Sequence, residues 1–302
     1  MNKFLNRGLV FAGVVSMSMG LFGGPKADAY GERQVDQFLN DSSKDYINLS
    51  GKDRQDTSRL ISQMAYDHSD EVIIVDGSNY VDSMSAIQVS AYLDAPILLN
   101  GKAGLDKGTR AEMIRLRAEH AYLVGCNINP KLEADLVEEG CKVTRISAEK
   151  PFDLSYKCGE FANKNNSNPK KSLILASSEV FADSLSMSSY SYTNKVPMLL
   201  VPKDIDDNMA KIINDYGAEE VLVIGGENTI SSESMAKIGK ARRISGQDRY
   251  QTSRIIQKDY YPDSKNSLVA SGLTFADTVA ASPLAGLMKA NIVLVKKTSE
   301  EV

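Results

Sequence analysis

Two stretches of this 302-residue chain carry arginines, acids and hydroxyl side chains at the same spacing. Residues 50–59 read S-G-K-D-R-Q-D-T-S-R, and residues 245–254 read S-G-Q-D-R-Y-Q-T-S-R. Guanidinium groups make charge-assisted hydrogen bonds to phosphate and carboxylate groups, and the N-terminus of a helix favours negative charge. The pattern therefore predicts contacts to an anionic ligand from the arginines of both stretches. These candidates are Arg54, Arg59, Arg249 and Arg254.

The same arginines also have a structural interpretation, in which each pairs with a neighbouring acid and orients an interface between parts of the chain. Asp53, Asp56 and Asp248 are close enough in sequence to form such pairs. Ion pairs within a motif often position an interface and not a ligand, so both interpretations stay open. The other motif residues are expected to shape the segment. They are Gly51, Asp53, Thr57, Gly246, Asp248 and Thr252.

Hydroxyl and carboxyl side chains also recur where we expect helices to begin. Such side chains cap a helix by accepting a hydrogen bond from a backbone N–H group, and capping needs no ligand. We therefore predict capping by Thr57, by Thr252 and by three pairs of residues that follow apolar runs. The pairs are Asp82-Ser83, Asp183-Ser184 and Asp277-Thr278.

Two further segments could bind phosphate or a metal ion, but each has a simpler interpretation. Gly225 and Gly226 follow an apolar run, yet this segment lacks the glycine spacing and the lysine of a phosphate-binding loop, which favours a tight turn. Asp204, Asp206 and Asp207 resemble the acidic group of toprim-type metal sites, but aspartates at a helix start usually cap the helix. We predict no metal site and no cofactor.

Histidine and cysteine are too few for a zinc site. The chain has 2 His and 3 Cys, whereas a zinc site takes three or four ligands, mostly nitrogen or sulfur. Cys126, Cys141 and Cys158 allow either one disulfide with a leftover thiol or three free thiols. No cysteine and histidine stand at a spacing typical of a nucleophilic pair.

The composition is that of a globular protein, with 25% charged and 42% apolar residues. The formal net charge is −4, so the chain has no bulk positive field of the kind that binds nucleic acid. We therefore expect no nucleic-acid partner.

The first residues have the order of a secretory signal peptide. Lys3 and Arg7 precede an apolar stretch that is too short to span a bilayer, and Ala27-Asp28-Ala29 supplies a cleavage site. We predict a signal peptide over residues 1–29 and a lead-in helix over residues 30–46. No second apolar stretch of spanning length follows, so we expect an exported chain without a membrane span.

Apolar segments recur with a period just under 100 residues. Residues 96–99 read P-I-L-L, residues 197–200 read P-M-L-L, and residues 291–294 read N-I-V-L. Short Val/Ile/Leu runs alternate with amphipathic stretches, which predicts an α/β fold of parallel strands covered by helices. In the first period we expect strands at 71–76, 97–100, 121–125 and 143–146, and helices at 81–93, 107–119 and 130–139.

The period divides the chain into tandem repeats of about 97 residues. We assign repeat 1 to residues 47–145, repeat 2 to residues 146–242 and repeat 3 to residues 243–302. Strands are expected at 172–176, 197–201 and 220–224 in repeat 2, and at 267–270 and 291–295 in repeat 3. The second half of repeat 3 is expected to be missing.

This arrangement resembles the cell wall binding repeat 2 family of Gram-positive cell-surface proteins, which are associated with surface layers. The resemblance rests on three segments in family order, Ile244–Arg254, Phe275–Thr278 and Val223–Asn228, and it covers essentially the whole chain after the signal peptide. It implies repeats of a toprim-like or doubly wound fold, packed around a pseudo-threefold axis. It also implies an exported protein held non-covalently to an anionic, teichoic-acid-like wall polysaccharide, with surface-layer proteins as further partners.

Repeat 2 departs from the family pattern at its start. Where the motif is expected, residues 147–156 read S-A-E-K-P-F-D-L-S-Y, so the Gly, Asp, Thr and both Arg are replaced. Any ligand contact by this segment is therefore doubtful.

Three functions compete at this point. The first is a wall-binding surface protein without catalysis. The second is a wall hydrolase of the N-acetylmuramoyl-L-alanine amidase type, and the third is an adhesin or surface-layer assembly component. Repeated residues favour binding, because catalysis needs one asymmetric site.

Overall fold

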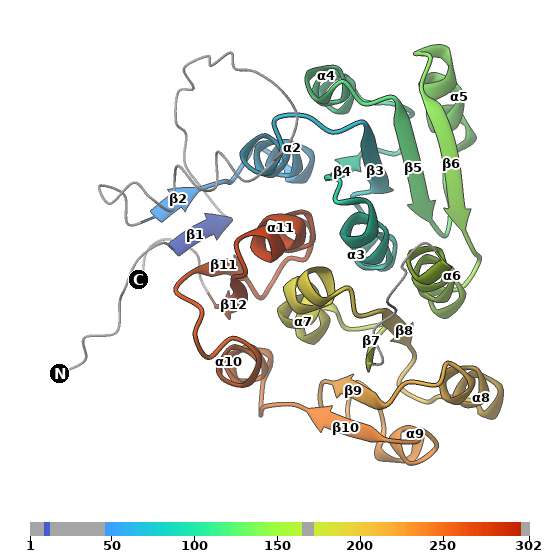
Figure 1. Cartoon of the computed structure of the whole chain (residues 1–302), viewed down its shortest axis with the longest axis vertical. Helices are drawn as coiled ribbons and strands as arrows, with labels where there is room; N and C mark the ends of the chain where they lie inside the picture. The colour runs from blue at the N-terminus through green and yellow to red at the C-terminus, as the bar shows by residue number, and fades with distance from the viewer. Residues whose placement is uncertain (1–8, 13–45, 165–171, 297–302) are drawn as a thin grey trace.

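The chain folds into three parallel β-sheets arranged around three central helices (Figure 1). The structure, a computed structural model, describes residues 9–12, 46–164 and 172–296. The central helices are α3 (Tyr80–Leu93), α7 (Phe181–Asn194) and α11 (Ala276–Leu287), and each packs against the other two. The predicted α/β fold of tandem repeats around a pseudo-threefold axis is therefore confirmed.

Repeat 1 begins with a helix and continues through a sheet in the order β4-β3-β5-β6. Its elements are α2 (Arg54–Ala65), β3 (Glu71–Asp76), α3, β4 (Ile97–Asn100), α4 (Lys107–Leu116), β5 (His120–Gly125), α5 (Pro130–Glu138) and β6 (Lys142–Ser147). All strand pairs in this sheet are parallel. The strands predicted for this repeat are confirmed within one residue at either end.

Repeat 2 repeats this order, with its sheet arranged as β8-β7-β9-β10. Its elements are α6 (Pro151–Lys164), β7 (Ser172–Ser177), α7, β8 (Met198–Val201), α8 (Asp207–Asp215), β9 (Glu220–Ile224), α9 (Ser232–Ala236) and β10 (Ala241–Ile244). Repeat 3 contributes α10 (Arg249–Tyr260), β11 (Ser267–Ser271), α11 and β12 (Asn291–Val295).

The third sheet contains strands from both ends of the chain. Its order is β12-β11-β1-β2, where β1 is Leu9–Ala12 and β2 is Tyr46–Asn48. Strand β2 leads into α2, just as β6 leads into α6 and β10 leads into α10. Each repeat therefore takes the last strand of its sheet from the segment that enters the next repeat, and the third sheet closes the ring with β2.

Strand β1 lies parallel to both β11 and β2, in the place that β5 and β9 have in the other sheets. The predicted signal peptide lies outside the described residues except for these four. The predicted lead-in helix over residues 30–46 also lies outside them except for Tyr46, which is in a strand and not in a helix. The helix prediction is wrong at this residue because it pairs with β1.

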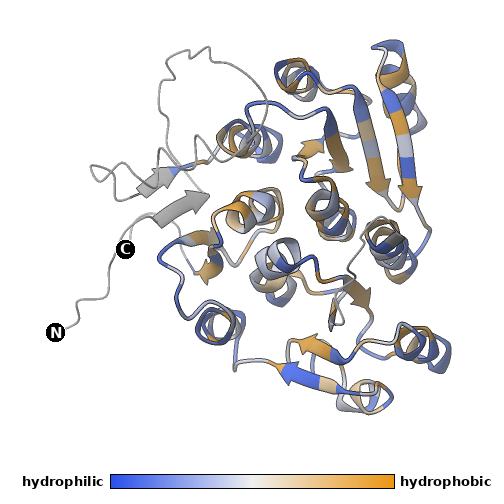
Figure 2. Cartoon of the chain, in the orientation of Figure 1, coloured by the Kyte–Doolittle hydropathy of each residue, from blue (hydrophilic) through white to orange (hydrophobic). Residues whose placement is uncertain are grey.

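Small side chains let the three central helices approach closely. Ser186, Ser188 and Ser189 of α7 are at most 1% exposed, and the Ser188 hydroxyl lies 2.7 Å from that of Ser282 in α11. Figure 2 shows apolar residues on strands such as β4 and β9 and on the inner helix α11. The core thus runs continuously from each sheet to the centre of the molecule.

Candidate functional site

The two copies of the motif fold into the same turn at the start of α2 and α10. Asp53 caps α2 by accepting a hydrogen bond from Asp56 N at 2.7 Å, and Asp248 caps α10 in the same way. Thr57 and Thr252 lie one turn inside these helices, where each hydroxyl accepts a hydrogen bond from the motif glycine. The capping prediction is wrong for both threonines, because the cap is the aspartate four residues earlier.

The motif glycines are required by this turn. A Cβ atom on Gly51 would lie 2.5 Å from Thr57 N, and one on Gly246 would lie 2.7 Å from Thr252 N. No side chain fits at these distances without moving the backbone. The glycine and threonine of the motif therefore form one structural unit.

The first arginine of each motif donates a hydrogen bond within its own repeat and packs on an aromatic ring of a neighbouring repeat. Arg54 donates a hydrogen bond from Nη1 to Gly77 O at 2.6 Å, and its guanidinium lies 5.9 Å from the centre of the Phe275 ring. Arg249 donates to Gly272 O at 2.6 Å and lies 5.6 Å from the centre of the Phe181 ring. These contacts support the structural interpretation of both arginines. Their role as ligand contacts stays a prediction.

The second arginine of each motif has different surroundings in the two copies. Arg59 is half-buried and pairs with Asp56 at 2.9 Å and with Asp106 at 3.8 Å. Arg254 is exposed and has no ion pair or hydrogen bond within the described part of the chain. Arg254 is therefore the candidate arginine whose guanidinium has no partner among the described residues and is exposed to an external anion.

The rings contacted by these arginines belong to a three-ring cluster on the pseudo-threefold axis. Tyr80, Phe181 and Phe275 occupy the same position in the three repeats, at the start of the central helices. Their centroids are 5.8 to 6.3 Å apart. This cluster was not predicted from the sequence, although an aromatic residue stands two positions before each Asp-Ser or Asp-Thr pair.

Asp82 and Asp183 are not caps. Asn79 caps α3, and α7 and α11 begin without a side-chain cap. Asp82 is 2% exposed and accepts a hydrogen bond from Cys126 N at 2.9 Å, because it lies one turn inside the helix, facing the end of β5. Ser83 and Ser184 donate to backbone carbonyls of their own helices, and Thr278 is buried. The side chain of Asp277 lies outside the described residues.

Burial shifts both described aspartates toward the protonated form. Burial raises the pKa of Asp82 to about 6, and the nearby Asp76 adds to this rise, while the hydrogen bond from Cys126 opposes it. Burial also raises the pKa of Asp183, where Thr252 and the Arg249 guanidinium oppose the rise. Both opposing groups belong to repeat 3 and act on Asp183 across a repeat boundary, whereas the groups that act on Asp82 lie in its own repeat.

The predicted tight turn at Gly225 is confirmed. Gly225 has a φ of +106°, and a Cβ atom there would lie 2.4 Å from Thr229 Oγ1 and 2.9 Å from Asp183 Oδ2. Gly226 has open space around its Cα. The carbonyl of Gly225 accepts a hydrogen bond from Arg243 at 2.7 Å. This segment thus forms a turn packed over the start of α7.

The acidic and cysteine-containing segments have structural roles. Asp206 caps α8 by accepting a hydrogen bond from Met209 N at 2.7 Å, as predicted, and Asp207 pairs with Lys237 at 2.9 Å. All three cysteines are free thiols, which is the second of the two predicted arrangements. Among the described residues, no group of three or more His, Cys, Asp or Glu side chains could hold a metal ion.

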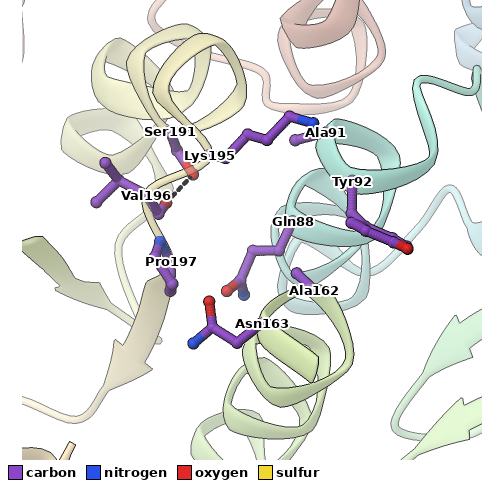
Figure 3. Close-up of a pocket in the computed structure, with 9 residues that line it drawn as sticks. All are labelled: Gln88, Ala91, Tyr92, Ala162, Asn163, Ser191, Lys195, Val196 and Pro197. Carbon is purple, nitrogen blue, oxygen red and sulfur yellow. Dashed lines mark hydrogen bonds between the residues drawn. The ribbon is translucent and has the colours of Figure 1, made fainter. Parts of the chain in front are cut away.

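A narrow cavity between α3, α6 and α7 has about 10 Å³ of space, enough for a water molecule at most (Figure 3). Gln88 lines it and donates to Ser155 O at 3.1 Å and to Met198 O at 2.9 Å. Its Oε1 accepts a hydrogen bond from Met198 N at 3.2 Å. We interpret this cavity as part of the joint between repeats 1 and 2, and not as a ligand site.

Two larger hollows lie at the surface of repeat 1. One, of about 760 Å³, runs between the ends of β5 and β6 and helix α6, where repeat 2 has lost the motif. The other, of about 640 Å³, lies beyond the carboxyl ends of β3 and β5. This second hollow is bounded by the starts of α3 and α5 and by Phe275 of repeat 3.

Two exposed lysines lie at corresponding positions in repeats 1 and 2, just after an edge strand of each sheet. Lys102 follows β4 and Lys203 follows β8, and both are exposed. Within the described residues, neither ammonium group has an ion-pair or hydrogen-bond partner. These lysines were not predicted as site residues, although a lysine stands two residues after the repeated apolar strand in both repeats.

Comparison with protein families matches the chain to Cell wall binding domain 2 (CWB2) over residues 48–127, 145–235 and 243–302. Among curated proteins, it is 24% identical over 249 residues to N-acetylmuramoyl-L-alanine amidase LytC of Bacillus subtilis, covering 82% of the chain and 49% of that protein. It is 25% identical over 257 residues to the Amidase enhancer of the same organism, covering 83% of the chain and 35% of that protein.

Two solved structures with this fold are proteins of Clostridium difficile. Cwp6 matches with a TM-score of 0.76 and 29% identity, over 83% of the chain and 41% of Cwp6. Cwp8 matches with a TM-score of 0.75 and 25% identity, over 84% of the chain and 45% of Cwp8. The chain thus spans about half or less of the length of these four relatives. No helix among the described residues is long and apolar enough to cross a membrane.

Proposed function

The chain belongs to the Cell wall binding domain 2 family, and from this premise we propose that it attaches non-covalently to an anionic polysaccharide of a bacterial cell wall. In this proposal the three repeats bind and do not catalyse. The observation that carries it is the family match in three separate segments, one in each repeat.

The ring of three repeats suits a polymeric ligand. A polymer presents the same chemical group many times, so one chain can reach more than one repeat. Linked weak sites then gain affinity through effective concentration. The common fold of the repeats, with equivalent strand ends, supports this mode of binding.

Exposed cations of the three repeats are the proposed contacts to the polymer's negative groups. Lys102 and Lys203 take equivalent positions after β4 and β8 in repeats 1 and 2, and Arg254 adds an exposed guanidinium from α10 in repeat 3. The net charge of −4 does not oppose such contacts, because charges further away than about 10 Å are largely screened at moderate salt. Arg54, Arg59 and Arg249 contribute mainly by holding the motif segments in place.

We further propose that the chain is exported and resides at the surface of a Gram-positive cell, where surface-layer proteins are its neighbours. Amidase activity is not part of this proposal. The amidase name belongs to a relative of which the chain spans 49%, and the residues matched in the chain are those of the wall-binding family.

Sedimentation with isolated cell walls tests the proposal. The purified chain is mixed with Bacillus subtilis walls before and after acid extraction of the anionic polymer, across a salt series. We expect sedimentation with intact walls, loss of at least 80% of it after extraction, and weakening with salt because ionic contacts are screened. Equal sedimentation with extracted walls would contradict a polymer ligand.

A double variant, Lys102→Gln with Lys203→Gln, tests the proposed contacts. We expect at least fivefold weaker wall binding with an unchanged unfolding midpoint, because neither ammonium group has a partner within the described chain. Lys211→Gln is the matched control, since Lys211 is an exposed lysine of α8 that pairs with Asp215. Wild-type binding by the double variant would remove these lysines from the proposed site.

A further inference from the structure

The hollow beyond β3 and β5 has the position of a ligand site in an open parallel sheet. In the order β4-β3-β5-β6, the chain leaves β3 toward one edge of the sheet and leaves β5 toward the other. Ligands of such sheets bind beyond the carboxyl ends of the strands where the order reverses. The cavity of about 640 Å³ lies at this point and is within the size range of small-ligand sites.

Two aromatic rings form part of the cavity wall. Tyr80 and Phe275 line it, both are half-buried, and their ring centres are 5.9 Å apart. The Tyr80 hydroxyl donates to Ser177 O at 2.9 Å, and the Arg54 guanidinium packs over the Phe275 ring. Both rings are thus fixed by these contacts and remain partly exposed. Such rings pack against the C–H groups of a sugar ring.

Hydrogen-bonding groups lie beside the rings. Asp76 and Asp82 line the cavity, and Asn127 contributes an exposed amide. Asp76 Oδ1 already accepts hydrogen bonds from the backbone N–H and the hydroxyl of Ser78, at 2.8 and 2.7 Å, which holds this carboxylate in place. Carboxylates accept hydrogen bonds from hydroxyl groups, and an amide can both donate and accept. This set suits a ligand that carries several hydroxyl groups.

The charged side chains that line the cavity determine which chemical group of an anionic polysaccharide can enter it. Two carboxylates line the cavity, and like charges repel strongly where water is partly excluded. A phosphate group is therefore disfavoured inside, whereas a neutral sugar residue is not. Lys102 also lines the cavity but is exposed, so it can meet a phosphate outside.

We propose that this cavity binds a neutral sugar residue of the wall polymer, stacked on Tyr80 and Phe275 and hydrogen-bonded to Asp76 and Asn127, while Lys102 contacts the adjoining phosphate. The inference rests on the proposed function and names the part of the polymer that repeat 1 recognises. The two rings come from different repeats, so the site exists only in the assembled ring.

Titration calorimetry with two probes tests the inference. One probe is an anionic wall polysaccharide whose sugar units are joined through phosphodiester bonds, and the other is the neutral oligosaccharide released from it when hydrofluoric acid cleaves those bonds. We expect both to bind the wild-type chain. Tyr80→Ala should weaken the oligosaccharide at least tenfold, whereas Tyr80→Phe should keep its affinity within threefold because the ring remains.

Two further variants separate the roles of charge and shape. Asp76→Asn keeps the shape of the side chain and should weaken the oligosaccharide at least threefold, which tests the site if Tyr80→Ala fails to fold. Lys102→Gln should weaken only the intact polymer. Phe181→Ala is the matched control, because Phe181 belongs to the three-ring cluster but does not line this cavity.

The outcomes distinguish this inference from the proposed function. If the intact polymer does not bind the wild-type chain, the proposed function fails. If the polymer binds but the oligosaccharide does not, or if Tyr80→Ala and Asp76→Asn leave its affinity unchanged, only the sugar site is overturned. Displacement of the oligosaccharide by inorganic phosphate would also overturn it, since the cavity would then accept an anion.

Discussion

Helices α10 and α6 begin equivalent repeats, but only α10 carries the intact motif. At α10 the motif forms a turn held by hydrogen bonds, and its residues are Gly246, Asp248, Arg249 and Thr252. The arginine of this turn packs on Phe181 of repeat 2. At α6, Pro151 takes the place of the arginine and the buried Leu154 that of the threonine. The helix occupies the same place in both repeats, so the motif is not needed to form the helix or to place it against its sheet.

One polar residue is common to all three starts. Ser58, Ser155 and Ser253 are fully buried, and each hydroxyl accepts a hydrogen bond from the backbone N–H of an edge strand. These N–H groups belong to Leu99, Leu200 and Leu294, at 3.0, 2.9 and 3.3 Å. The serine thus satisfies a strand edge in every repeat, and this need explains its presence in repeat 2.

The joints between repeats differ where the motif differs. Between repeats 1 and 2 there is no motif arginine, and the Gln88 amide bonds to the backbone of Ser155 and Met198 instead. An amide in the core and an arginine at the surface therefore hold equivalent boundaries. The motif therefore acts mainly in fixing how neighbouring repeats pack at their boundary, and less in forming the helix.

The largest expected effect is that of Gly246→Ala. The added Cβ would lie 2.6 to 2.7 Å from atoms of Gln251 and Thr252, so the turn must open, and we expect the free energy of unfolding to fall by about 3 kcal/mol. Urea unfolding followed by circular dichroism measures this change.

Gly101→Ala is the control for that variant, because a Cβ atom there meets nothing within 4 Å. Its free energy of unfolding should stay within about 0.5 kcal/mol of wild type. If Gly246→Ala is as stable as the control, the motif turn at α10 is not rigid. The intact motif would then give α10 no structural feature that α6 lacks.

A second prediction concerns the buried carboxyl that faces the altered boundary. The pKa of Asp82 is raised from 3.8 to about 6, so the folded chain binds this proton more tightly than the unfolded chain. The stabilisation from Asp82 is therefore fully present below about pH 3.8 and is lost as the pH rises through 6. Asp82→Asn should remove this loss, which amounts to about 2 kcal/mol between pH 4 and pH 7.

Urea unfolding of wild type and Asp82→Asn at several values between pH 4 and pH 7.5 measures the difference. Besides burial, the groups that affect the pKa of Asp82 are Cys126, Asp76 and Asn79. Burial and then Asp82 raise the pKa of Cys158 in α6. Asp183→Asn serves for comparison and should change less with pH, because Thr252 and Arg249 oppose the rise in the pKa of Asp183. A parallel pH dependence of wild type and Asp82→Asn would refute the prediction.

The smallest effect is expected from Arg249→Lys. Lysine keeps the charge but loses the planar group that bonds to Gly272 O and packs on Phe181, so we expect a loss of about 1 kcal/mol. Arg54→Lys should lose a similar amount, because its contacts are the same in kind. A double-mutant cycle with Phe181→Leu measures the coupling, and zero coupling would show that the ring contact contributes nothing.

The strand positions followed from sequence because continuous Val, Ile and Leu runs have one stable location, inside a parallel sheet covered on both faces. The roles of side chains that contact residues far away in the chain could not be predicted from the sequence. The capping roles predicted for Thr57 and Asp82 are wrong because a hydroxyl or carboxylate one turn inside a helix bonds to whichever N–H the fold brings near. For Thr57 this is Gly51 N, and for Asp82 it is Cys126 N.

By itself, the sequence determined the period of the repeats, the order of strands and helices and the α/β class, because these depend on local hydrophobic patterns. Only the tertiary structure decided that β2 closes the sheet of repeat 3, that Arg54 and Arg249 pack on rings of other repeats, and that Tyr80 and Phe275 share one cavity wall. Each of these joins residues that are far apart in the chain, and such contacts are set by how whole repeats pack around the axis.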